Sequence, residues 1–177
     1  MKILALDSSG LVASVAVVEN DTLLAEYTVN YKKTHSQTLL PMLDEISNMT
    51  ELDLSTIDAI AVAGGPGSFT GLRIGSATAK GLGLALEKPL ISIPTTAAIA
   101  YNIWDTDKFV CPIMDARRNQ VYTGVYCYTD HRLDTVWEQD TMSIEALAEG
   151  LNCLDHEVIF LGDGVAVYRE KLEALDR

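Results

Sequence analysis

The sequence predicts an α/β protein made of two lobes, each with a mixed β-sheet covered by helices. Three observations lead to this fold class. Short apolar runs alternate with helical patterns, as in layered α/β folds. The order of strands and helices in the first half begins again near residue 105. At 177 residues the chain is long enough for two small lobes. We therefore expect an N-terminal lobe at 1–105 and a C-terminal lobe at 106–177.

The first lobe is expected to begin with three short strands. Apolar runs occupy residues 2–7, 13–19 and 22–29, and short turn segments join them, which is typical of a meander. The continuous apolar run at 57–64 ends in glycines, as in a buried parallel strand. A shorter run at 89–94 adds a fifth strand. These runs together predict a mixed sheet.

Three helices are expected in the same lobe. Residues 37–49 carry apolar side chains at spacings of three and four, which indicates one buried helical face. A second helix is expected over 70–87, directly after a glycine-rich turn. A third helix is expected over 95–104, with Thr95 or Thr96 as its N-terminal cap. These helices supply the cover for the sheet.

The second lobe repeats this order of elements. Strands are expected at 109–115, 121–128, 135–142 and 157–164, and an amphipathic helix at 143–151. A further helix follows the last strand. Because no residue-by-residue identity links the two halves, the duplication is inferred from the order of elements alone.

Charge and cysteine content narrow the function classes. The net charge is −12, so the chain by itself is not expected to bind nucleic acid. Its only adjacent basic pairs are at 32–33 and 117–118. Three widely spaced cysteines without a C-x-x-C motif indicate a reducing compartment. No apolar run approaches the roughly 20 residues that span a bilayer. We expect a cytoplasmic protein without a membrane segment.

The stretch AGGPGSFTGLRIG, residues 63–75, raises the question of a phosphate-binding loop. A P-loop would require lysine and then serine or threonine after its last glycine, but Leu72 and Arg73 follow Gly71. A dinucleotide fingerprint fails by one residue, because Gly71 lies too far from Gly67. The position between a strand and a helix still suits an anion. Phosphate binding therefore remains the weaker alternative to a packing role for these glycines.

The helix after this stretch has two faces of small or apolar residues. One contains Gly71, Gly75, Thr78 and Leu82, and another contains Ala77, Gly81 and Leu84. Glycine inside a helix costs roughly 1 kcal/mol relative to alanine, so close packing must compensate. One face is expected to pack on the sheet. The other packs either on a helix of the same chain or on a partner subunit.

The sequence indicates neither a metal site nor a set of catalytic residues. His35, His131 and His156 lie far apart and lack the spacing of metal ligands. No Ser-His-Asp or Cys-His arrangement is evident. We expect no catalytic residue, no metal and no cofactor.

Five stretches together resemble the TsaB (YeaZ) family: LALDSS, THSQTLLPML, AVAGGPGSFTGLRIGSATAKGLGLAL, PTTAAIA and PIMDARRNQVYTGVY. The match runs from residue 1 to about 128 and continues weakly through FLGDG. The resemblance implies the actin/hexokinase/Hsp70-like (ASKHA) superfold, which is a duplicated mixed-sheet fold of two lobes. Members of the family usually continue past the end of this chain, so we expect the second lobe to be incomplete.

The resemblance also implies a function and partners. Family members are non-catalytic scaffold or activator subunits in the formation of threonylcarbamoyladenosine in tRNA. They bind the related catalytic protein TsaD, act with the ATPase TsaE, and self-associate through the helices that follow the first sheet. This chain is then expected to form a homodimer when alone and to meet tRNA only through the complex. The expected partner interface comprises Leu39, Met42, Leu43, Gly71, Gly75, Thr78 and Leu82.

An enzyme of the same superfold is the alternative, such as an ATP- or metal-dependent small kinase or a glycoprotease-like hydrolase. ATPases of the superfold hold phosphates and metal with two aspartate-bearing turns. In the second turn of this chain, Arg117 and Arg118 stand where glycines would leave room for phosphate. The pair of histidines that holds metal in the catalytic relatives is absent from residues 95–105. The possible remnant of a nucleotide site comprises Asp7, Ser8, Ser9 and Asp115.

Overall fold

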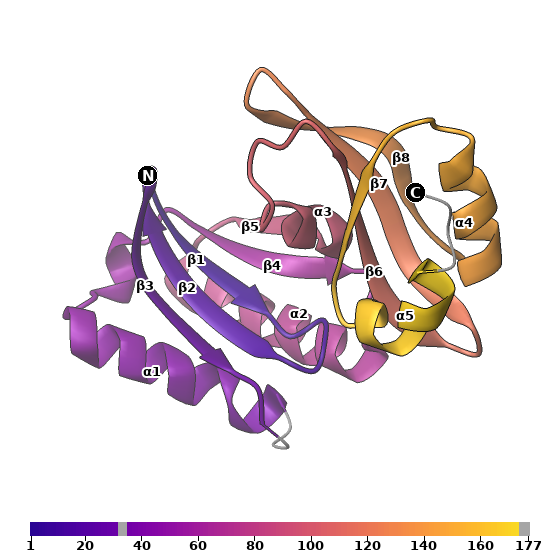
Figure 1. Ribbon diagram of the computed structural model, residues 1–177. Coiled ribbons are helices and arrows are strands. Elements are labelled where there is room, and N and C mark those ends of the chain that lie inside the picture. Colours follow the sequence, from indigo (N-terminus) through magenta and orange to yellow (C-terminus); the bar gives the residue numbers. More distant parts are fainter. Residues whose placement is uncertain (32–34, 174–177) are drawn as a thin grey trace. The chain divides into compact units, whose positions relative to one another are not determined.

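The computed structural model describes residues 1–31 and 35–173 (Figure 1). The chain divides into two compact units, Met1–Ile93 and Pro94–Arg177. This division lies earlier than the lobe boundary expected after residue 105, because helix α3 (Thr95–Ala100) contacts strands β6 and β7 of the second unit. No helix among the described residues is both long and apolar enough to cross a membrane.

The first unit is built on a five-stranded sheet with the order β3-β2-β1-β4-β5. β1 pairs with β2 and β2 with β3 in antiparallel fashion, whereas β1 and β4 are parallel. The meander and the buried parallel strand expected from the sequence are confirmed. The strands are β1 (Lys2–Asp7), β2 (Ala13–Glu19), β3 (Thr22–Val29), β4 (Ala59–Gly65) and β5 (Leu90–Pro94).

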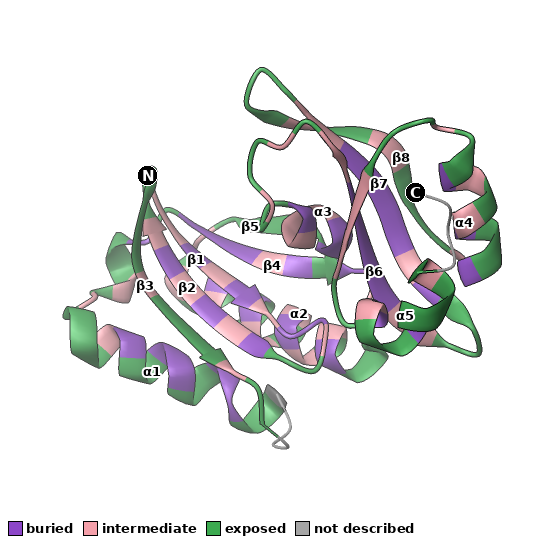
Figure 2. Ribbon diagram, in the orientation of Figure 1, coloured by how far each residue is buried: buried purple, intermediate pink, exposed green. Residues whose placement is uncertain are grey.

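Helices α1 (Leu39–Thr50) and α2 (Phe69–Leu86) pack on one face of this sheet. Two short 3₁₀ helices, His35–Gln37 and Leu54–Thr56, flank α1. Figure 2 shows the alternation of buried and less buried residues along β1 and β2 that period-two side-chain direction produces. The two helices and the strands share one apolar core, formed by Leu4, Leu6, Val15, Val17, Leu39, Met42, Leu43, Ile46, Ile60 and Ala79 among others.

The second unit repeats the order of the first with one strand fewer, as β8-β7-β6-β9. β6 pairs with β7 and β7 with β8 in antiparallel fashion, and β6 runs parallel to β9. The repetition confirms the duplicated mixed-sheet α/β fold that the ASKHA resemblance implies. The strands are β6 (Phe109–Arg117), β7 (Gln120–Thr129), β8 (Arg132–Ser143) and β9 (Val158–Leu161).

Helices α4 (Ile144–Asn152) and α5 (Gly164–Glu173) cover a core of the second sheet. The Ser143 side chain accepts the N–H of Ala146, 3.1 Å away, and caps α4 as expected. The core residues are Cys111, Ile113, Val121, Val125, Ile144, Leu147, Leu151 and Tyr168.

Helix α3 differs from its prediction. It ends at Ala100, and its N-cap residue is Pro94, so the expectation of a threonine cap is wrong. Thr95 and Thr96 are instead fully buried residues of its first turn. The Thr96 hydroxyl lies 2.7 Å from the hydroxyl of Tyr126, and this hydrogen bond links α3 to β7. In the sequence, a threonine that caps the helix cannot be distinguished from a threonine that is buried in its first turn.

Candidate functional site

The first turn of the N-terminal unit, residues 7–9, lies directly after β1. Within it, the Ser9 N–H donates to Oδ1 of Asp7 at 2.7 Å, which closes an Asx turn. The Ser8 hydroxyl donates to the carbonyl of Gly71 in α2 at 2.9 Å. Ser8 and Ser9 are 2% and 3% exposed. Two of the three residues of the expected nucleotide-site remnant in this unit are thus part of the interior.

The glycine-rich loop after β4 covers this turn. The Ser68 N–H donates to the carbonyl of Ser9 at 2.6 Å. Gly67 lies so close that a Cβ there would collide with the same carbonyl oxygen. At the start of α2 the Ser68 side chain accepts the Gly71 N–H at 3.3 Å. Because these amides are used inside the unit, the geometry favours the packing role of the glycines over phosphate binding.

The glycine face of α2 is also internal. Gly71 and Gly75 are buried, and a Cβ added to Gly75 would lie 2.5 Å from the Ser8 hydroxyl oxygen and 3.6 Å from Val62. Thr78 is half-buried. This face therefore packs on β1 and β4, and these glycines are not surface positions of the unit.

The other residues of the expected partner interface have the same environment. Leu39, Met42 and Leu43 on α1 are at most 4% exposed and belong to the core of the unit. Leu82 on α2 is half-buried and packs against that core. Their burial speaks against a partner surface formed by these side chains. The helical spacing of residues 37–49, which predicts one buried face, is the spacing of this core-facing side.

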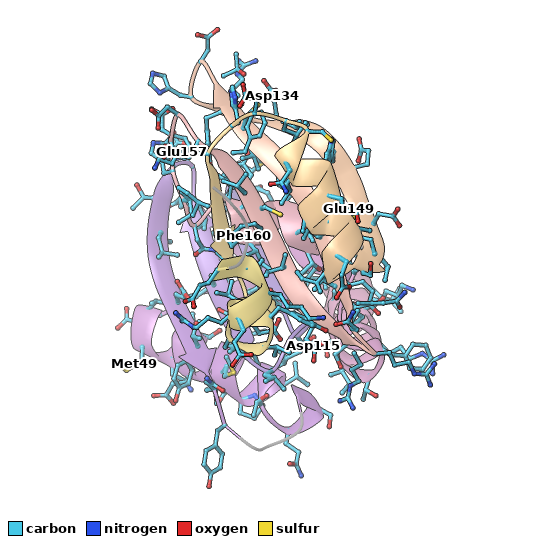
Figure 3. All side chains as sticks on the ribbon, turned by 45° about the vertical axis from the view of Figure 1, so that its right-hand side comes forward. Met49, Asp115, Asp134, Glu149, Glu157 and Phe160 are labelled. Atoms are coloured by element: carbon cyan, nitrogen blue, oxygen red, sulfur yellow. The ribbon has the colours of Figure 1, made fainter. Side chains whose placement is uncertain are left out.

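The exposed side of α2 is made of different residues. We call it the outer helical face. Arg73 lies over the ring of Phe69, with 3.8 Å from its guanidinium carbon to the ring centroid. A Cβ added to Gly81 would meet nothing within 4 Å. On α1, Leu40 and Met49 are exposed as well, and Figure 3 labels Met49 at one end of that helix. The face comprises Phe69, Ala77, Gly81 and Leu84 of α2, all exposed.

The second turn, residues 115–119, comprises the end of β6 and the two residues before β7 in the C-terminal unit. Oδ1 of Asp115 accepts the Arg117 N–H at 2.9 Å and the Tyr168 hydroxyl at 3.1 Å. The Asp115 N–H donates to Asp163 Oδ1 at 3.2 Å. Burial and, second, the hydrogen bond to Asp115 raise the pKa of the Tyr168 hydroxyl, so it remains a donor at neutral pH. Sequence reasoning missed Tyr168, which lies 53 residues away in the chain.

A second glycine turn, after β9, packs against β6. Gly162 has φ of +103°, and a Cβ there would collide with the carbonyl oxygen of Ile113. A Cβ on Gly164 would lie 2.9 Å from the same oxygen. The weak FLGDG match in the sequence therefore marks a close approach of backbones, as the glycines after β4 do in the first unit.

The histidines and cysteines form no centre among the described residues, where no three His, Cys, Asp or Glu side chains gather as metal ligands would. His131 Nδ1 lies 2.6 Å from Asp105 Oδ2 on the surface, and the His156 ring packs 4.4 Å from that of Phe109. The side chain of His35 lies outside the described residues. Burial raises the pKa of the Cys111 thiol to about 12, which leaves it unreactive.

Comparison with known proteins identifies the family to which the chain is similar. Residues 22–175 match the family model described as TsaD, tRNA N6-adenosine threonylcarbamoyltransferase. The tRNA threonylcarbamoyladenosine biosynthesis protein TsaB of Bacillus subtilis is 35% identical over 98% of this chain and 76% of its own length. The TsaB protein of Escherichia coli is 32% identical over 93% of this chain and 72% of its own.

Solved structures agree with the sequence relatives. A Pseudomonas aeruginosa protein described as similar to peptidase YEAZ superposes with a TM-score of 0.84 at 29% identity, over 96% of this chain and 79% of that chain. The structure of YeaZ from the same organism gives a TM-score of 0.73 at 31% identity, over 81% and 68%. The resemblance seen in the sequence is confirmed, and the chain belongs to the TsaB (YeaZ) family.

Proposed function

We propose that this chain is a non-catalytic scaffold or activator subunit in the formation of threonylcarbamoyladenosine in tRNA. The curated relatives from two bacteria carry names that refer to this biosynthesis. The family model that matches is named after the transferase itself, TsaD. A subunit related to the catalytic protein, but lacking its chemistry, accounts for both names.

The observation that carries the proposal is that polar groups of both turns are hydrogen-bonded within their own unit. In the first unit, the Ser8 hydroxyl and the Ser9 carbonyl are bound to the loop and helix that follow β4. In the second unit, the Tyr168 hydroxyl binds the carboxylate of Asp115. An ATPase needs these positions for phosphate oxygens and a metal ion. Here they hold the fold together instead.

The partners follow from this assignment. The chain binds a TsaD-like catalytic subunit, acts with a TsaE-like ATPase, and forms a homodimer when alone. It works in the cytoplasm and meets tRNA through the assembled complex. Its charge of −12 supports a need for the complex, since an acidic chain alone repels the phosphate backbone.

We assign the contact with the TsaD-like subunit to the outer helical face. Leu84 is 84% exposed and Phe69 is 68% exposed, and both project from α2. Small residues between them, Ala77 and Gly81, allow close approach of a partner helix. Exposed apolar side chains beside small residues suit the packing of a partner helix against α2.

Leu84→Asp tests this surface. Its side chain is exposed, so the variant should stay folded with an unchanged thermal midpoint. It should fail to co-elute with the TsaD-like subunit, because a charge in a desolvated interface costs several kcal/mol. Leu11→Asp is the matched control, since Leu11 is 76% exposed in the same unit but outside the face. Retention of the partner by Leu84→Asp would contradict the assigned surface.

Calorimetry with ATP and Mg²⁺ distinguishes the subunit from the alternative enzyme. We expect no heat of binding and no ATP hydrolysis by the isolated chain, and no tightly held zinc or iron by elemental analysis. Turnover that disappears with Asp7→Ala would instead support a kinase or hydrolase.

A further inference from the structure

The turn between β6 and β7 contains two exposed arginines whose backbone has the left-handed conformation, which is unfavourable for most residues other than glycine. Arg117, Arg118 and Asn119 have φ of +65°, +52° and +62°. Arg117 pairs with Gln120, so Arg118 and Asn119 are the two central residues of a hairpin whose positive φ values are those of a type I′ turn. We call residues 117–119 the arginine turn.

Arginine is a poor residue for this conformation. Asparagine visits the left-handed region readily, but an ordinary side chain there is penalised by its Cβ. The neighbouring hairpin between β7 and β8 uses Asp130 and His131, with φ of +49° and +63°. Aspartate and histidine are enriched in this region, as asparagine is. One turn of the unit therefore follows the usual turn chemistry, and the arginine turn does not.

The two guanidinium groups are available for a ligand. Both side chains are exposed, and in residues 1–31 and 35–173 neither forms an ion pair. The neighbouring carboxylates already have other donors. Glu145 binds Lys171 Nζ at 2.5 Å, and Asp115 binds the Tyr168 hydroxyl. Two adjacent positive charges thus project from a chain whose net charge is −12.

The base of the turn is held by hydrogen bonds with side chains of α4 and α5. Asn119 donates to Glu145 Oε2 at 2.7 Å and accepts from Lys171 Nζ at 2.5 Å. The Tyr168 hydroxyl is 3.2 Å from the Gln120 carbonyl. Figure 3 labels Asp115, which binds the Arg117 N–H at the end of β6. Because α4 and α5 fix the backbone, binding an anion here orders little more than the two arginine side chains.

We propose that the arginine turn contacts the phosphate backbone of tRNA when this chain is part of the modification complex. The inference rests on the proposed function, which brings tRNA to the complex. Guanidinium groups bind phosphate in bidentate fashion and retain their charge at every relevant pH. Two contacts are too few for the acidic chain to bind tRNA alone, but they add to the contacts of its partners.

The test uses the complex assembled with the TsaD-like and TsaE-like proteins and measures tRNA affinity at several salt concentrations. Arg117→Ala/Arg118→Ala should weaken binding roughly tenfold. The slope of log K against log salt should become less steep by about 1 to 2, as expected for two lost phosphate contacts. Arg132→Ala/Arg169→Ala is the matched control, because it removes the same charge from two exposed arginines elsewhere in the unit. The control should change the slope little.

A second variant separates binding from folding. Arg117→Gly/Arg118→Gly relieves the left-handed backbone, so its thermal midpoint should rise while tRNA affinity falls. Arg117→Lys/Arg118→Lys keeps both charges and should retain most of the salt slope. Equal affinity and slope for the alanine variant and its control would overturn the proposal. So would failure of the alanine variant to assemble with the TsaD-like subunit, because that would indicate that the arginines bind an acidic protein partner.

The outcome is distinguishable from failure of the proposed function. If the wild-type chain does not assemble with the TsaD-like subunit, the subunit role fails before tRNA is added. If it assembles and supports tRNA binding that is insensitive to the arginines, only the present inference fails.

Discussion

After β1, the first turn lies under a glycine loop, and Ser8 and Ser9 are nearly inaccessible. After β6, the equivalent turn of the second sheet is exposed and carries two arginines with positive φ. Four strands have the same order in both sheets, β3-β2-β1-β4 and β8-β7-β6-β9. In the first unit the glycine turn packs on the turn after β1, and in the second it packs on β6. The two units therefore share the packing of their glycine turns but differ in the turn after the first strand. That turn is buried in the first unit, whereas in the second unit it is exposed and positively charged.

The largest effects are expected where the two units agree, at their glycine turns. Gly67→Ala and Gly162→Ala each place a Cβ against a carbonyl oxygen, of Ser9 and of Ile113. Both should lower the free energy of unfolding by about 3 kcal/mol, from backbone strain and overpacking together. Urea denaturation measures this. A large cost in one unit and none in the other would break the equivalence of the two turns.

An intermediate effect is expected at Gly75, beside the buried turn. Gly75→Ala should cost about 1 to 3 kcal/mol, because its Cβ displaces the Ser8 hydroxyl from its bond to Gly71. In the double variant Ser8→Ala/Gly75→Ala the obstacle is gone, so the combined cost should be less than the sum of the single costs. Gly81→Ala, on the open side of α2, should instead stabilise by roughly 1 kcal/mol.

Strict additivity of Ser8→Ala and Gly75→Ala would show that the two residues do not touch. The glycine face would then be free for a subunit, as the family resemblance implies.

A smaller effect of opposite sign is expected at the exposed turn. Arg118→Gly should raise the free energy of unfolding by about 1 kcal/mol, because glycine adopts positive φ without a Cβ penalty. Thermal denaturation of the isolated chain measures it. The matched change Asp130→Gly, in a turn with suitable residues, should gain less. A loss of stability in Arg118→Gly would mean that the arginine side chain supports the fold.

The smallest effect concerns the charges that hold the arginine turn. Hydrogen bonding to Lys171 lowers the pKa of Glu145. The pair therefore stabilises the folded state at pH values above the ordinary pKa of a glutamate. This stabilisation is lost as the pH falls through the lowered pKa of Glu145. In a carboxyl NMR titration, Lys171→Met should move the pKa of Glu145 upward. Lys108→Met, which breaks the separate pair with Glu157, should leave it unchanged.

Much of the fold could be predicted from local patterns. The strands of the first sheet, the cap at Ser143 and the repeated order of elements follow from alternation, turn residues and short connections. The limits of α3 could not, because Thr95 and Thr96 have the residue type of caps but are buried by tertiary contacts. Propensity does not contain that information.

The candidate site was harder to predict for the same reason. Helical periodicity groups Gly71 with Gly75 correctly, but it does not say which face meets the sheet. Leu39 and Met42 were placed at a partner surface, and the structure places them in the core. The bond from Tyr168 to Asp115 joins residues far apart in the chain and leaves no local pattern.

The strand order also bears on how the chain folds as it is made. β5 completes the first sheet at Pro94, before β6 begins at Phe109. The first unit therefore has all its strands while the second is still in the ribosome, and domains fold as units from the N-terminus. The second sheet must wait for β9, because β6 needs this partner from beyond β8 and α4. During synthesis, the buried turn is thus expected to close well before the arginines take their final positions.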